Sequence, residues 1–213
     1  MDNQKKYFKI TNATENHNGF QYHDGLNILT EPFVENGSCV AGGLYFTDVE
    51  HIFHFVSYGV YLREIILPIA DSDFKCVADK NDKWRANKLI FGLRYNLYDI
   101  STFQYLIQLG ANYLLGEYNL LQWAAYKGHY AIVEYLISLP GLKDNKWAYK
   151  YAIWAACKDN YFNIIRLLIN VGANIRKNHE PLRKAVMVGD LTMVVFLVEN
   201  GAKVYANKNH AVR

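Results

Sequence analysis

Histidines and aspartates that could bind a metal occur in two short segments within the first 80 residues of the chain. His51 and His54 are three positions apart, so a helix over 48–59 would bring both to one face. Paired imidazoles are common in zinc sites, but no third ligand stands at a fitting spacing. Segment 71–79 holds three aspartates, whereas a calcium loop needs tighter alternation and a closing glutamate. We therefore expect solvated polar residues, with no metal and no cofactor.

Motifs of common catalytic sites do not occur in this sequence. It contains no phosphate-binding Gly-x-x-x-x-Gly-Lys-Ser/Thr loop, no His-Glu-x-x-His and no Gly-x-Ser-x-Gly. Cys39, Cys76 and Cys157 are odd in number and far apart, without a Cys-x-x-Cys pair. Their pattern favours reduced thiols in a cytosol-like compartment.

Composition and charge indicate an ordinary globular chain with an uneven charge distribution. Of 213 residues, 51% are hydrophobic and 20% are charged. Residues 1–92 carry 9 Lys and Arg against 12 Asp and Glu, whereas the remainder carries 14 against 8, so the net charges are −3 and +6. The positive charge of the second part is modest, and its lysines and arginines form no dense block. We therefore expect no specific nucleic-acid binding. No secretory signal and no apolar run of membrane-spanning length is present, so no membrane association is expected.

The second half of the sequence repeats itself. The run "NLLQWAAYKGHYAIVEYLISLPG" (119–141) aligns with 151–174 and with 180–203, and a degenerate copy ends in "FQYLIQLGAN" (103–112). Each copy contains two helical patterns, and the second pattern has an apolar stripe that one copy cannot bury alone. A period near ~30 residues with paired helices is typical of a stacked-repeat architecture.

The repeated segments resemble ankyrin repeats. "EPLRKA" (180–185) and "NLLQWAA" (119–125) stand where that family has Thr-Pro-Leu-His-x-Ala, and "GHYAIVEYLI" and "GANI" are also typical. The Lys-, Asn- and Tyr-rich style is similar to ankyrin-repeat proteins of mimivirus-type giant viruses. The resemblance implies an all-α stack of about four units with a short C-terminal end, at approximately 93–112, 113–142, 143–174 and 175–207.

Several residues with chemical potential fall at structural positions of this repeat. Gly128 and His129 match the turn between the two helices of a unit, so His129 is interpreted as a turn residue rather than a catalytic one. Trp123, Trp147 and Trp154 are interpreted as packing residues, because aromatic side chains at repeat positions usually fill core volume.

In ankyrin-like stacks the turn tips and the exposed sides of the first helices form a concave binding face. Carrying those variable positions onto this sequence gives a basic, tyrosine-rich set of partner-binding residues. The set is Tyr118, Tyr126, Lys127, Tyr149, Lys150, Lys158, Arg176, Lys177, His179 and Met187.

Residues 1–92 show no repeat and are expected to form a small α+β domain. Short β-rich segments separated by turn clusters predict a mostly antiparallel sheet. The segments are 7–11, 19–29, 42–47, 62–69 and 87–92. Apolar spacing over 48–59 predicts a helix with Thr47 or Asp48 as its N-cap.

This first domain is also loosely similar to the cores of ADP-ribosyltransferases, through "GLNI", "GGLYFTD" and "YLREIILP". That resemblance implies that His17 and Tyr45 hold a nicotinamide ribose and that Glu64 stabilises the reacting centre. The sequence departs from that family, because His17 lies in a turn and Glu64 comes early in the strand order.

The sequence therefore predicts an α+β N-terminal domain over residues 1–92, followed by an all-α ankyrin-like stack over residues 93–213. We expect a non-enzymatic module that binds another protein. If the resemblance to viral proteins holds, the partner is a host protein and the location is the host cytoplasm. The alternative is an ADP-ribosyltransferase-like enzyme whose repeats recruit its substrate. The last residues, "HAVR", stand opposite "EPLR" and are expected to form a frayed end.

Overall fold

The computed structural model describes residues 5–80, 82–115 and 119–204. The chain divides into two compact units, Met1–Leu115 and Gly116–Arg213, which we call the sheet unit and the repeat unit. The boundary expected after residue 92 falls inside strand β9 (Lys88–Asn96). The sheet unit also includes the helix that follows this strand, α1 (Ile100–Gln108).

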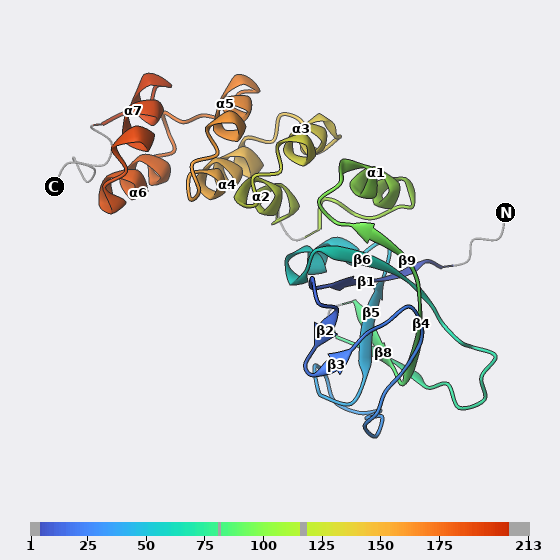
Figure 1. Ribbon diagram of the computed structural model, residues 1–213. Helices are drawn as coiled ribbons and strands as arrows, with labels where there is room; N and C mark the ends of the chain where they lie inside the picture. Colours follow the sequence, from blue (N-terminus) through green and yellow to red (C-terminus); the bar gives the residue numbers. More distant parts are fainter. Residues whose placement is uncertain (1–4, 81, 116–118, 205–213) are drawn as a thin grey trace. The chain divides into compact units, whose positions relative to one another are not determined.

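A seven-stranded sheet forms the frame of the sheet unit (Figure 1). Its order is β4-β9-β6-β1-β5-β8-β7, and every recorded pairing is antiparallel, as the sequence predicts. The remaining bounds are β1 (Tyr7–Thr11), β4 (Gly25–Ile28), β5 (Leu44–Asp48), β6 (Tyr61–Ile66), β7 (Cys76–Asp79) and β8 (Lys83–Ala86). A separate hairpin joins β2 (Asn16–His17) and β3 (Phe20–Gln21). The sequence did not predict β7 and β8, because their charged residues hide the two-residue alternation.

Apolar side chains cover both faces of this sheet. On one face, Phe8 of β1 contacts the ring of Tyr105 in α1, with ring centroids 6.4 Å apart. On the other face, Tyr22, Phe46 and Phe91 belong to a buried cluster. Residues 8–11 of β1 are all buried. Both faces of this central strand are therefore covered, whereas a strand at the surface would alternate buried and exposed side chains.

The helix expected over 48–59 is shorter and of a different kind. Residues Ile52–Tyr58 form the 3₁₀ helix η1, and its N-terminal flanking residue is His51. Thr47 and Asp48 belong to β5, so their prediction as an N-cap is wrong. The sheet ladder requires those residues to be extended, and it overrides their local preference for a helix start.

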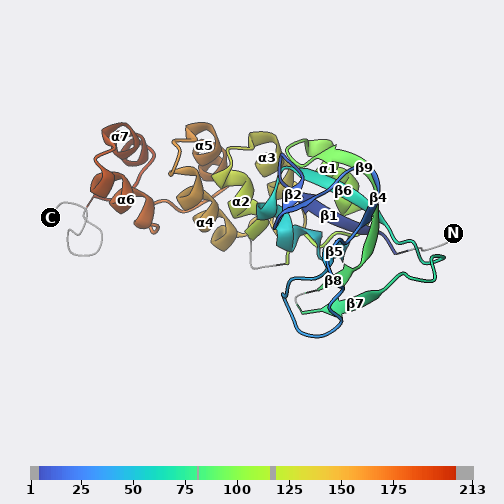
Figure 2. The ribbon, with the colours of Figure 1, turned by 60° about the horizontal axis from the view of Figure 1, so that its bottom comes forward.

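Three helical pairs make up the described part of the repeat unit. The pairs are α2 (Asn119–Tyr126) with α3 (Tyr130–Ser138), α4 (Lys146–Ala156) with α5 (Phe162–Asn170), and α6 (Glu180–Val188) with α7 (Leu191–Glu199). Figures 1 and 2 show α2, α4 and α6 in one row and α3, α5 and α7 in a second. Buried alanines such as Ala124, Ala155 and Ala156 let the first helices approach closely, which is the stacked arrangement that the repeats predict.

Repeated backbone hydrogen bonds confirm the alignment of the three copies. The amide after each turn donates to a carbonyl of the first helix: His129 to Ala124, Tyr161 to Ala156 and Asp190 to Ala185, at 2.9–3.1 Å. The turn residues themselves have positive φ values of 75°, 58° and 74° at Gly128, Asn160 and Gly189. The equivalence read from the sequence is therefore an equivalence of backbone conformation.

The first expected unit, 93–112, differs from the other three. Residues up to Asn96 complete β9, and only α1 follows, so this segment has one helix instead of two. The end of α1 nevertheless repeats the later copies, because the Ala111 amide donates to the Leu106 carbonyl as Ala173 does to Leu168. The degenerate copy is thus the second half of a unit whose first half is replaced by a strand.

Candidate functional site

Helix α4 presents a row of aromatic and basic side chains to solvent. Trp147, Tyr151 and Trp154 are 65%, 42% and 38% exposed, and Lys158 follows just beyond the helix. Steps of four, three and four residues place them along one side of the helix. Intervening residues such as Ala152 and Ile153 are buried in the stack. The repeat fold therefore keeps this side of α4 uncovered.

Lysine ammonium groups lie over the aromatic rings of neighbouring helices. The Lys158 Nζ donates to the Tyr126 hydroxyl and lies 4.3 Å from the centroid of that ring. The Lys184 Nζ of α6 lies 5.0 Å from the Trp154 centroid. Such cation–π contacts join α2 to α4 and α4 to α6.

We name this surface the aromatic–lysine face. It consists of nine exposed or half-buried side chains of α2, α4, α6 and the turns that directly follow them; the exposed Lys146 and Arg183 of the same helices are not counted, and Arg183 pairs with Glu180. The nine are Tyr126, Lys127, Trp147, Lys150, Tyr151, Trp154, Lys158, Lys184 and Met187.

The electrostatics of the face favour an acidic ligand. Among the described residues, Lys127, Lys150, Lys158 and Lys184 form no ion pair with a carboxylate. The hydrogen bond with Tyr126 raises the pKa of Lys158, so this ammonium stays charged at neutral pH. The face thus offers positive charges beside exposed rings, which suit carboxylates flanked by apolar groups.

The structure divides the partner-binding residues expected from the sequence into three groups. Tyr126, Lys127, Lys150, Lys158 and Met187 lie on the aromatic–lysine face. A second group lies instead in the segment that leads into α6: Arg176 and Lys177 are exposed, and His179 is half-buried next to the first residue of that helix.

Tyr149 and Tyr118 form the third group. Tyr149 is 1% exposed and its hydroxyl accepts from the Asp144 amide at 2.9 Å, so it is a packing residue. Its place at the buried side of α4 excludes it from a binding surface. Tyr118 lies outside the described residues.

Sequence reasoning missed Trp147, Tyr151, Trp154 and Lys184 as members of the face. The interpretation of Trp147 and Trp154 as packing residues is wrong, since both are exposed, whereas that of Trp123 is confirmed by its 7% exposure. Their exposure could have been predicted from the helical phase. Trp147 and Trp154 are close to two turns apart, so they share one side of α4, and this side differs from the one that carries the alanines.

His129 has the structural place that the sequence predicts. It is the residue directly before α3, its amide bonds to Ala124, and its ring lies 5.5 Å from that of Trp123. Burial lowers the pKa of His129, which favours the neutral imidazole. These contacts make it part of the turn packing.

The sheet unit does not assemble the transferase constellation. His17 and Tyr45 line one pocket, but Glu64 is not among the lining residues and instead pairs with the Lys6 ammonium at 2.8 Å. The Tyr45 hydroxyl donates to the Val40 carbonyl at 2.7 Å. The acid that the resemblance implies is thus engaged elsewhere.

The possible metal-binding residues of the sheet unit have partners within the protein, and His51 and His54 both lie within 4.0 Å of the Asp82 carboxylate. The His51 Nδ1 bonds to Asp48 at 2.7 Å, and the rings of His51 and His54 are 6.0 Å apart. Asp71 pairs with Lys88, whereas Asp79 accepts from Ser38 at a different place. Within residues 5–80, 82–115 and 119–204, no three such side chains gather around one point.

Paired helices joined by a left-handed turn and stacked in register define a helical-repeat protein of the ankyrin class. The family model for ankyrin repeats, in three copies, matches residues 121–208. Two ankyrin repeat proteins of Acanthamoeba polyphaga mimivirus are similar: R868 is 45% identical over 62% of this chain and 67% of its own length, and R229 is 44% identical over 61% and 46%. The chain belongs to the ankyrin-repeat proteins.

The similarity to viral proteins extends beyond the repeats. Uncharacterized protein R869 of the same virus is 44% identical over 62% of this chain and 98% of its own length. Residues 121–213 make up less than half of the chain, so each of these alignments includes part of residues 1–120. The chain spans less than half the length of R229, and no solved structure matches it significantly. No helix in the described ranges is long and apolar enough to cross a bilayer.

Proposed function

We propose that the repeat unit binds an acidic segment of another protein through the aromatic–lysine face. The observation that carries this proposal is the placing of lysines beside exposed or half-buried rings of α2 and α4, with Lys158 over Tyr126 and Lys184 of α6 over Trp154. Ankyrin repeats suggest a protein-interaction module, and a preformed helical surface loses little conformational entropy when it binds. The sheet unit needs no catalytic role in this mechanism.

Aromatic burial supplies most of the affinity, and the lysines select the partner. Exposed ion pairs contribute about 0.2–1 kcal/mol each, whereas burying an aromatic anchor at the centre of an interface contributes about 2 kcal/mol or more. Trp154 is central, because it lies between Tyr151 on its own helix and Lys184 on α6. Arg176, Lys177 and His179, in the segment that leads into α6, add further basic side chains to the repeat unit.

Since the relatives are viral, we propose a host protein as the partner and the host cytoplasm as the place of the encounter. The test is affinity capture from host lysate with the full chain, followed by mass spectrometry and by binding measurements on the purified partner. A double variant, Trp154→Ala with Lys184→Ala, is expected to weaken binding by about 2 kcal/mol or more, roughly 30-fold.

The second-helix row supplies a matched control. Tyr130 of α3 is 37% exposed and Arg166 of α5 is exposed, so Tyr130→Ala with Arg166→Ala removes one aromatic and one cation from the other row. This control is expected to keep the wild-type affinity. Equal losses in the two double variants, or none in the first, contradict the assignment of the face.

A further inference from the structure

The sheet unit contains a pocket of about 810 Å³ whose walls are aromatic and basic. Strands β1 and β5, the β2–β3 hairpin and the segments 28–31 and 39–43 contribute to it. Its aromatic residues include Phe20, Tyr22 and Phe46, which belong to or pack against the buried cluster of the sheet. The only carboxylate among its lining residues is the exposed Glu31.

Lys9 lines this pocket from the central strand and is only 7% exposed. Its Nζ donates to the Tyr45 carbonyl at 2.8 Å and lies 4.9 Å from the centroid of the Tyr22 ring. Within the described residues, no carboxylate lies at ion-pair distance from it. Burying an ammonium group without a counter-ion destabilises the folded protein. Packing therefore does not explain why a lysine stands at this position.

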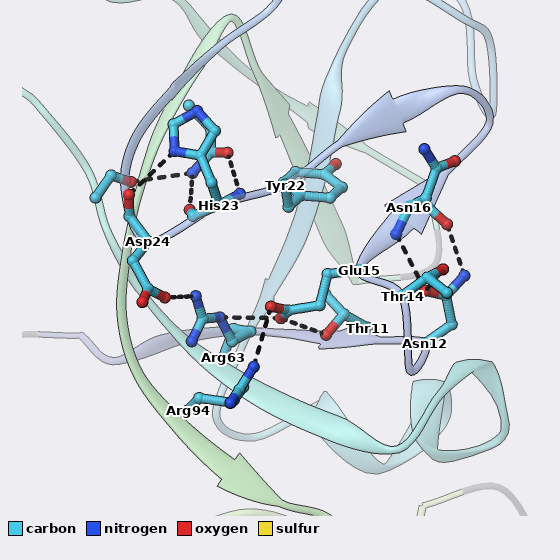
Figure 3. A network of polar contacts seen from close by, with 12 residues as sticks. Thr11, Asn12, Thr14, Glu15, Asn16, Tyr22, His23, Asp24, Arg63 and Arg94 are labelled. Atoms are coloured by element: carbon cyan, nitrogen blue, oxygen red, sulfur yellow. Dashed lines mark hydrogen bonds and ion pairs between the residues drawn. The ribbon is translucent and has the colours of Figure 1, made fainter.

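The neighbouring strand β6 holds a buried cation that, unlike Lys9, has carboxylate partners. Arg63 of β6 stands directly opposite Lys9 in the register and is 2% exposed. It forms ion pairs with Glu15, at 3.1 Å, and with Asp24 (Figure 3). The Glu15 carboxylate also accepts from Thr11 and pairs with Arg94. The chain thus supplies two carboxylates to one buried cation and none to its cross-strand neighbour.

We propose that this pocket binds a small organic anion, an aromatic or planar apolar body with one carboxylate or phosphate group, and that the anionic group pairs with Lys9. The rings of Phe20, Tyr22 and Phe46 cover the apolar body. Lys83 adds a second cation at the pocket, where its Nζ lies 4.8 Å from the Tyr45 ring and 3.0 Å from the Cys39 Sγ. The site lies within the sheet unit, and it is independent of the aromatic–lysine face.

Titration of the pocket supports the proposal. Burial, followed by the neighbouring Lys83 charge, lowers the pKa of Lys9 to about 7. An anion favours the protonated form, so binding is coupled to proton uptake by Lys9. Burial lowers the pKa of His17 to about 4, which keeps it neutral, and burial raises the pKa of Tyr22.

Cys39 is a second titratable group at the pocket. Hydrogen bonds from Lys83 and then Ser38 lower the pKa of this thiol. A thiolate at the pocket would repel an anion as the pH rises, so its effect must be separated from that of Lys9. The variant Cys39→Ser removes this titration and leaves Lys9 in place.

The test compares three probes of similar shape on the full chain by calorimetry and ligand-observed NMR. Benzoate and phenyl phosphate distinguish carboxylate from phosphate, and benzyl alcohol is the neutral analogue. Either anion is expected to bind wild type more tightly than the alcohol. Lys9→Met should weaken anion binding by roughly 10- to 100-fold, the effect of one charged hydrogen bond, and leave the alcohol unaffected.

Two controls keep the result interpretable. Lys75→Met removes an exposed lysine that pairs with Glu35 at 2.8 Å, and it is expected to bind like wild type. In the Cys39→Ser variant, benzoate affinity should be constant from pH ~5.5, where benzoate is almost fully ionised, to pH ~7, and fall by up to roughly tenfold per pH unit above it, since Lys9 then loses its proton. The proposal is overturned if no anion binds wild type at millimolar concentration, if the alcohol binds as well as the anions, or if Lys9→Met or rising pH leaves anion binding unchanged.

Discussion

At the scale of single residues, the buried charges of the sheet unit differ in how they are compensated. Arg63 is held by carboxylates, and its position is that of a structural ion pair. Lys9 has a carbonyl and an aromatic ring instead. A cation of the second kind destabilises the fold whenever it is protonated, because the unfolded chain solvates the ammonium better.

This difference predicts how stability depends on pH. The folded-state pKa of Lys9 is about 7, below the ordinary value of 10.5, so the unfolded chain binds more protons between these two values. The contribution of Lys9 to the free energy of unfolding therefore rises from pH 7 to about 10 and is at its lowest below 7. Lys9→Met should stabilise the sheet unit by a few kcal/mol, on the order of the pKa shift, at pH 6 and by much less at pH 10.

Urea denaturation of wild type and Lys9→Met at pH 6, 8 and 10 measures this effect. Lys75→Met serves as the reference, because its exposed ion pair with Glu35 contributes little to stability. A stability difference between Lys9→Met and wild type that is the same at all three pH values would show that Lys9 keeps its proton throughout.

At the scale of the elements, the helical pairs share one turn but not the same local support. Only α7 of the three second helices has a side-chain N-cap among the recorded contacts: the Asp190 carboxylate accepts from the Met193 amide at 2.9 Å. The side chains of the equivalent residues, His129 and Tyr161, do not cap α3 and α5. Repeats of one family therefore reach the same backbone by different side-chain contacts.

Removing the Asp190 cap should destabilise the last pair. Asp190→Ala is expected to lower the free energy of unfolding of the repeat unit by about 1 kcal/mol, because the first amides of α7 lose their acceptor. Asp190→Asn keeps a side-chain oxygen at this position and should lose clearly less. Thermal or urea unfolding followed by circular dichroism distinguishes the two, and equal losses would argue against the cap.

The turn glycines provide a second test at this scale. Gly128 and Gly189 have φ values of 75° and 74°, so alanine is strained equally at both. A Cβ at Gly128 would lie 2.4 Å from the Tyr161 ring, whereas nothing lies within 4 Å of one at Gly189. Gly189→Ala should cost about 1 kcal/mol, and Gly128→Ala should cost about 1–3 kcal/mol more from overpacking.

Unfolding measurements on the two glycine variants and on Gly128→Ala with Tyr161→Ala check this expectation. Removal of the Tyr161 ring should abolish the difference that is specific to Gly128, apart from the ring's own contribution, which the single variant Tyr161→Ala measures. If Gly128→Ala and Gly189→Ala cost the same, the close approach of Tyr161 has no energetic consequence.

At the scale of the whole molecule, charge is distributed unevenly along the chain. Residues 1–92 have a net charge of −3 and residues 93–213 a net charge of +6. The lysines of the aromatic–lysine face add a local positive field to the repeat unit. Such a field accelerates the encounter with an acidic partner, and salt weakens it.

Salt should therefore act mainly on the association rate. Raising the ionic strength from ~0.05 to ~0.5 M shortens the screening length severalfold, so the association rate constant should fall while the dissociation rate constant changes little. Surface plasmon resonance with the captured partner measures both. Lys127→Ala with Lys158→Ala should reduce the salt dependence, and an unchanged salt dependence would exclude steering by these lysines.

Much of the repeat unit follows from the sequence because its determinants are local. The spacing of apolar residues specifies helices, the recurrence of Gly128, Asn160 and Gly189 specifies the turns, and an apolar stripe that one unit cannot cover requires stacking. The main strands of the sheet and its mostly antiparallel character were predicted too, because strand composition and turn clusters are local signals, whereas the order of the strands was not. The exposure of Trp147 and Trp154 was missed, since an aromatic residue fits a core and an interface equally well and only the helical phase, offset from the alanines, distinguishes the two.

Tertiary structure alone decided which charges meet. No local pattern places Lys9 opposite Arg63, because the register of β1 on β6 depends on the whole sheet. The same non-local pairing extends β9 to Asn96 and moves the limit of the sheet unit past residue 92. Helical repeats can be read from the chain because their contacts join near neighbours, whereas a sheet and its pocket are built from residues far apart in sequence, and only their packing determines which side chains are buried together.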